Sequence, residues 1–184
     1  MPYRLETLAA AVLAGARAVA WAQSPATAAQ DVQQQGNAFA AALLREDYVT
    51  VAASTCSPVL ARVGGAAALA RQIEVSFKVM QRQGRELLQM QFGPASALFD
   101  GAVTRFALVP YRSVVRIDGG RVALESFYLA VQNTGADAWC FVDTAALTPA
   151  SLHELFPGAP QALRLPPLAP AVIEHEPLTA SERQ

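Results

Sequence analysis

The chain has 184 residues, of which 53% are apolar and 16% are charged, with 14 basic residues against 15 acidic ones. It is too apolar and too weakly charged to be intrinsically disordered, and without a basic excess it is a poor candidate for binding nucleic acid through phosphates. Its length suits one domain with a sizeable core.

The first 22 residues have the pattern of a leader for export. Arg4 lies in a short N-terminal segment, a soft apolar stretch covers 5–16, and Ala20-Trp21-Ala22 places small residues before a cut after position 22. The apolar core is shorter than the about 20 residues of a membrane-spanning helix. Glu6 and Arg17 interrupt this pattern, so an Ala-rich amphipathic helix is the alternative. We expect an exported protein, periplasmic or secreted, with no membrane span in its mature form.

Helical spacing of apolar residues dominates the next part of the chain. After a polar lead-in over 23–30, we expect helices at about 31–45 and 66–83 and a shorter helical piece at 46–53. Pro58 should interrupt this piece, because proline disfavours helical geometry in the preceding residue.

Beyond Gly84 the period of the apolar residues changes from 3.6 to 2, which predicts strands. The expected strands cover 87–92, 95–99, 102–117, 121–131 and 138–143. A short helix should open at Thr148-Pro149, with threonine as its cap. Residues 169–184 form the expected flexible, proline-containing tail.

The two long strands are predicted to form a tight hairpin through 118–121, where glycines suit positive backbone angles. If Asp118 faces Arg121, then Tyr111 faces Tyr128 on the more apolar face. The opposite face carries charged residues, for which a solvated ion-pair cluster is the simplest interpretation.

Helices followed by four to five strands with short turns predict an α+β domain over 31–168. We expect the N-terminal helices to pack on a curved antiparallel sheet, with a conical cavity between them and a short C-terminal helix after the sheet. The sequence shows no internal repeat.

The series Asp47-Tyr48, Thr55, Pro58-Val59 and Gly64-Gly65, followed by a long helix, is one recognisable pattern. A second is the run from Trp139 to Thr144, which reads WCFVDT, followed by a short helix and Leu155-Phe156-Pro157. Both resemble an exported bacterial subgroup of the NTF2-like (cystatin-like, SnoaL-like) superfamily over about 38–167. The resemblance implies an NTF2-like cone. That superfamily includes isomerases, dehydratases, cyclases and binding modules, so the resemblance implies no single chemistry.

Two cysteines, Cys56 and Cys140, are separated by 84 positions. In an oxidising compartment they can form a disulfide, and two separate, partly buried thiols are the alternative. Neither cysteine has a histidine near it in the sequence, so neither a catalytic thiol nor a metal site is expected. The sequence indicates no cofactor.

Asp143 is the candidate general base, because it follows Trp139 and Phe141 on one face of the last expected strand. Aromatic surroundings would raise its pKa. The alternative is that Asp143 hydrogen-bonds the following turn. The candidate ligand-binding residues are Tyr48, Tyr111, Tyr128, Trp139 and Phe141, each of which can instead be a packed core residue.

Three functions remain open at this point. The first is non-catalytic binding of a small apolar ligand or a protein partner. The second is an isomerase or lyase with Asp143 as base and tyrosine hydroxyls as oxyanion donors. The third is a structural or dimerisation subunit that acts through its sheet face, since an amphipathic sheet with an uncovered face favours a homodimer.

Overall fold

The computed structural model describes residues 24–167 and 170–175, so the expected leader and positions 169 and 176–184 of the expected tail lie outside the described residues. The described chain is α+β. Its elements are α1 (Pro25–Leu44), α2 (Tyr48–Ala53), α3 (Ser57–Val63), α4 (Ala66–Arg82), β1 (Glu86–Phe92), β2 (Ala97–Asp100), β3 (Thr104–Ile117), β4 (Gly120–Asn133), β5 (Cys140–Asp143), a 3₁₀ turn (Thr144–Ala146), α5 (Pro149–Leu155) and β6 (Val172–His175).

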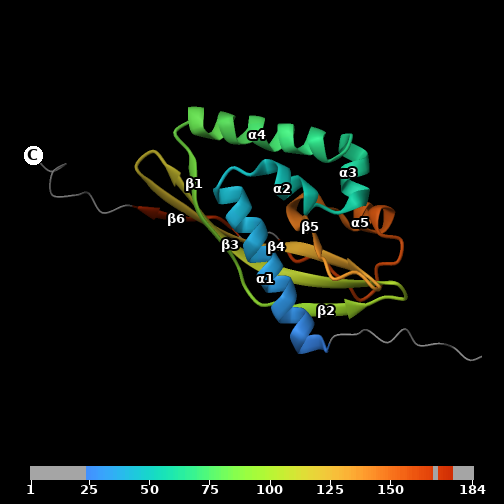
Figure 1. Ribbon diagram of the computed structural model, residues 1–184. Helices are drawn as coiled ribbons and strands as arrows, with labels where there is room; N and C mark the ends of the chain where they lie inside the picture. The colour runs from blue at the N-terminus through green and yellow to red at the C-terminus, as the bar shows by residue number, and fades with distance from the viewer. Residues whose placement is uncertain (1–23, 168–169, 176–184) are drawn as a thin grey trace, which may run out of the picture.

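The described strands form one antiparallel sheet in the order β1-β3-β4-β5 (Figure 1). β2 also pairs with β3, on the side that β1 occupies further along, and β6 also pairs with β4 beside the end that β5 leaves free. The long hairpin of β3 and β4 is therefore the centre of the sheet, and each flank is shared by two short strands.

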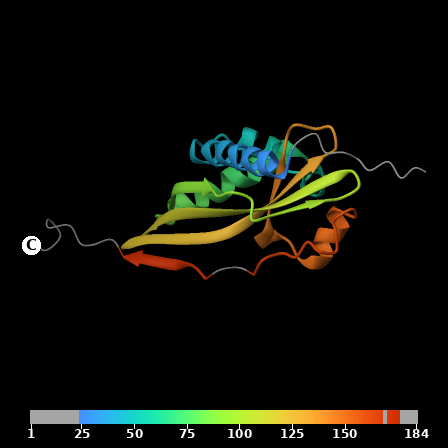
Figure 2. The same ribbon diagram turned by 90° about the horizontal axis from the view of Figure 1, so that it is seen from below.

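The sheet has a core on each face. Helices α1 to α4 lie on one side, whereas α5 and residues 156–167 after it lie on the other (Figure 2). The helix-side core contains Phe39 from α1, Phe92 from β1 and Phe141 from β5. The opposite core contains Phe106 and Leu129 from the central strands, packed against residues of α5 and the segment after it.

α1 crosses the helix-side face because one stripe of it is apolar or small. Ser24 caps the helix by accepting a hydrogen bond from the Thr27 amide, and Pro25 opens it. Val32, Gly36 and Phe39 of this stripe are buried. A Cβ atom on Gly36 would lie 2.8 Å from the Phe92 ring, so only glycine lets α1 approach β1 this closely.

The predicted hairpin register is wrong by two residues. Ile117 pairs with Gly120, so the turn consists of Asp118 and Gly119 alone. Two-residue turns with Asp-Gly match the twist of paired strands, and this preference selects the tighter loop. Because the shift is an even number of residues, every side chain keeps its predicted face, although Tyr111 now pairs with Ser126 instead of Tyr128.

Three further elements differ from the prediction. α1 begins at Pro25 instead of at about 31, and Pro58 does not only end a helix but lies in the first turn of α3. Val172–His175, assigned to the flexible tail, forms β6 and pairs with the start of β4. The sheet therefore has six strands instead of four to five.

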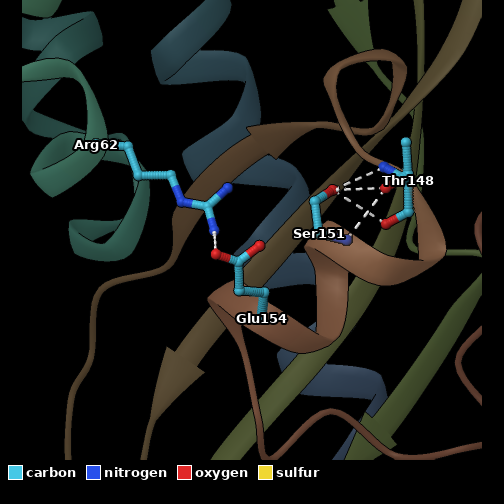
Figure 3. A network of polar contacts seen from close by, with 4 residues as sticks. All are labelled: Arg62, Thr148, Ser151 and Glu154. Atoms are coloured by element: carbon cyan, nitrogen blue, oxygen red, sulfur yellow. Dashed lines mark hydrogen bonds and ion pairs between the residues drawn. The ribbon is translucent and has the colours of Figure 1, made fainter.

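Two links fasten the α2–α3 region to β5 and α5. Cys56 and Cys140 form a disulfide, and beside it the Phe141 amide donates a hydrogen bond to the Ser54 carbonyl. Further along, Arg62 of α3 forms an ion pair with Glu154 of α5 (Figure 3). Figure 3 also shows Thr148 and Ser151, whose reciprocal hydrogen bonds cap α5. These contacts hold the α2–α3 region against β5 and α5.

Candidate functional site

Five aromatic rings fill the space between α1 and the sheet. Neighbouring ring centroids lie between 5.0 and 6.4 Å apart, a range in which aromatic rings attract one another. The rings belong to Phe39, Phe92, Tyr111, Tyr128 and Phe141. Three of the five candidate ligand-binding residues, Tyr111, Tyr128 and Phe141, are therefore brought together.

Asp143 lies at the border of this aromatic cluster, opposite Tyr128 in the pairing of β4 with β5. Burial raises the pKa of its carboxyl, although the Ala145 amide, which donates a hydrogen bond of 2.9 Å to Oδ1, acts in the opposite direction. Burial also raises the pKa of Tyr111 and of Tyr128, and the charge of Asp143 raises both further. The carboxyl and the two phenols thus interact electrostatically.

This arrangement has the ingredients of proton transfer: a carboxyl with a raised pKa and two hydroxyl donors within its field. It also has a structural role, because the Asp143 side chain caps the 3₁₀ turn that follows β5. The predicted alternative, that Asp143 hydrogen-bonds the following turn, is confirmed. Asp143 both caps this turn and has a raised pKa.

Trp139 and Phe141 are core residues, with 3% and 2% of their surfaces exposed. The Trp139 indole nitrogen donates a hydrogen bond of 3.0 Å to Asp31, and its backbone amide donates one of 2.8 Å to Gln35. Both of its donors are thus occupied by α1. The sequence could not show this, because the partners are more than 100 positions away.

Tyr48 lies apart from the other candidate residues. It packs on Phe77 of α4, with 5.4 Å between ring centroids. The neighbouring Asp47, which belongs to the first of the two sequence patterns, caps α2 by accepting hydrogen bonds from the amide and hydroxyl of Thr50. This end of the helical layer is held by packing and capping.

A groove of about 530 Å³ lies near the middle of the sheet. Two cross-strand pairs border it, Pro110 with Phe127 and Arg112 with Glu125. By alternation along the strands these side chains project away from the helices, and Phe127 packs against the core on that side. The groove is completed at the sheet edge by Gln33, Gln91, Phe92, Gly93 and Pro94, and Tyr111 and Ser126 also border it.

Sequence reasoning missed this groove, although Pro110 was a signal for it. Proline inside a long strand marks an irregular or edge position. Pro110 lies where the partner of β3 changes. β1 pairs with β3 as far as Tyr111, and β2 pairs with it from Leu108 onwards. The break between the two edge strands opens one end of the groove.

The chain matches no family model, no curated protein and no solved structure. Residues 24–167 and 170–175 contain no group of three or more His, Cys, Asp or Glu side chains that could hold a metal ion. None of the helices described here is long and apolar enough to span a membrane.

Proposed function

We propose that this chain is an exported, non-catalytic binding domain of the NTF2-like type, which holds a small, largely apolar ligand in the groove around Phe127. The order of helices before an antiparallel sheet supports the NTF2-like assignment, as does the resemblance of the two sequence patterns. The groove carries the binding proposal: its volume falls within the about 300–1,000 Å³ of small-molecule sites.

The lining of the groove also favours a ligand with a mainly apolar body. Phe127, Pro110 and Pro94 offer apolar surface, while Arg112 and Glu125 supply opposite charges at one end. A few polar groups around an apolar floor are the usual composition of a small-molecule site. Between α1 and the sheet, the rings of the aromatic cluster occupy the interior, and two of its members, Phe92 and Tyr111, also border the groove.

The binding proposal is tested with the fluorescent probe 1-anilinonaphthalene-8-sulfonate. Amide chemical shifts should move at the groove, and Phe127→Ser should weaken binding about tenfold, because the ring contributes a large apolar contact area. Val49→Ser is the matched control, since Val49 is 74% exposed on α2 and lies outside the groove. Shifts confined to other surfaces, or equal weakening by both variants, would contradict the proposal.

Export is supported by the Cys56–Cys140 disulfide, because disulfides persist in oxidising compartments. The mass of the protein recovered from the periplasm or medium of the producing cells should correspond to a chain that begins at Gln23, less two hydrogens. An uncut chain with two free thiols in the cytoplasm would refute the export proposal.

A second candidate function is proton transfer on a carbonyl compound, with Asp143 as base. The raised pKa of Asp143 beside Tyr111 and Tyr128 favours it. Cyclohexenone incubated with the protein in D₂O tests the reaction type. Deuterium incorporation that disappears in Asp143→Asn, but not in the surface variant Asp137→Asn, would favour an enzyme; no incorporation above the buffer rate would count against it.

A further inference from the structure

A second cleft, of about 370 Å³, lies on the helix side of the sheet, at the end where β1 begins. It is formed where the C-terminal ends of α1 and α4 approach the start of β1. Leu43, Phe77, Met80 and Leu87 supply apolar surface, and each is only half-buried. The cleft shares none of its lining residues with the groove around Phe127.

Two opposite charges also line this cleft. The Glu46 carboxylate accepts a hydrogen bond of 2.8 Å from the Gln81 amide, which fixes its position without neutralising it. Arg85 contributes a guanidinium that has no side-chain partner among the described residues. A further pair in the lining, Glu86 with Arg116, is already matched at 3.0 Å. One fixed negative and one available positive group therefore remain for a ligand.

The backbone at Glu46 supports this interpretation. Glu46 has φ 59°, and it is the only described non-glycine residue with a positive φ. Glycine is the ordinary residue at such a position after a helix, because it has no Cβ to clash. A glutamate held there, with its carboxylate fixed by Gln81 at the cleft, is a backbone outlier at a candidate site.

We propose that this cleft binds a zwitterionic α-amino acid with an apolar side chain. The ammonium group of the ligand pairs with Glu46, which lies just past the negative end of the α1 dipole. Its carboxylate pairs with Arg85, whose guanidinium can donate two parallel hydrogen bonds. Its side chain lies on Phe77, Met80 and their apolar neighbours.

Binding of L-phenylalanine to the full chain, followed by calorimetry and by amide chemical shifts, tests the proposal. Shifts should concentrate at 77–87, and the single-charge analogues phenethylamine and 3-phenylpropionate should each bind about tenfold more weakly. Failure of L-phenylalanine to bind saturably at the cleft, or equal affinity for all three compounds, would overturn the proposal.

Two variants assign the charges. Arg85→Gln should weaken the binding of L-phenylalanine and 3-phenylpropionate but leave that of phenethylamine unchanged. Glu46→Gln should weaken the binding of L-phenylalanine and phenethylamine but leave that of 3-phenylpropionate unchanged. Arg71→Gln is the matched control, since Arg71 is exposed on α4 outside the cleft. Variants that weaken the binding of all three ligands equally would overturn the assignment.

If a variant does not fold, the comparison of the three ligands on the wild-type chain still decides whether the proposal holds. Because the groove is probed with a different compound and a different variant, failure at one site is distinguishable from failure at the other.

Discussion

At the scale of single residues, Gly36 sets the distance between α1 and the sheet. A methyl group there would lie 2.8 Å from the ring of Phe92, which is fully buried. Overpacking of this kind costs about 1–3 kcal/mol, more than the about 1 kcal/mol that alanine gains over glycine within a helix. The close contact should therefore outweigh helix propensity.

We expect Gly36→Ala to lower the free energy of unfolding, measured by urea denaturation. Gln34→Ala, at an exposed position on the same helix, should change it by no more than about 0.5 kcal/mol. A Gly36→Ala protein as stable as the wild type would mean that α1 moves freely away from β1.

Asp143 provides a pH-dependent prediction. Burial raises its pKa above the ordinary value of 3.8, so the folded state binds this proton more tightly than the unfolded state does. Its contribution to stability is therefore lost as the pH rises from about 4 through the folded-state pKa, and the loss is complete above that value.

Asp143→Asn removes the titration and keeps an oxygen that can accept the Ala145 hydrogen bond. The variant should thus gain stability relative to the wild type at pH 7, and the gain should shrink towards pH 4. Urea denaturation at several pH values measures this. A difference that does not change with pH would show that capping, and not burial of the charge, determines the role of Asp143 in stability.

At the scale of elements, α1 is fastened by polar side chains to two distant parts of the sheet. Asn37 and Gln33 bind the amide and carbonyl of Phe92, the last residue of β1. Asp31 and Gln35 bind Trp139 just before β5. The contacts of Asn37 and Gln33 satisfy backbone groups at the end of β1, an edge strand, that would otherwise be open to pairing with another chain.

Asn37→Ala should lower the free energy of unfolding by about 1–3 kcal/mol, because it leaves the Phe92 amide without its acceptor. Hydrogen exchange should accelerate at Phe92 more than in β4. Gln34→Ala again serves as the control on α1. Unchanged protection of the Phe92 amide would show that water replaces Asn37 without loss.

At the scale of the whole molecule, the disulfide joins the helical layer to β5 across 84 positions of sequence. Removing such a link typically costs about 2–5 kcal/mol, much of it through the larger freedom of the unfolded chain. Replacing Cys56 and Cys140 together with serine should lower the midpoint of thermal unfolding, and a reducing agent should lower that of the wild type similarly. No change under reduction would mean that the contacts around Ser54 and Phe141 hold this region by themselves.

The sequence by itself determined the local elements and their faces. The 3.6-residue period located α4 to within one residue, and the change to alternation located β1 equally well. Alternation also placed Tyr111 and Tyr128 on one side of the sheet, even though their pairing was predicted two residues out of register. These features depend on near neighbours in the chain, so a linear pattern contains them.

Only the tertiary structure decided which of these residues have free surface. From the sequence, Trp139 was a candidate for ligand binding, but in the structure Asp31 and Gln35 of α1 accept hydrogen bonds from it. The groove beside Pro110 and the cleft beside Glu46 and Arg85 are each formed by segments far apart in the chain. The aromatic residues that signalled a ligand site are mostly used to fill the core, because large apolar rings gain most by leaving water. The open sites lie where strands break and helices end, and their positions follow from packing rather than from any local pattern.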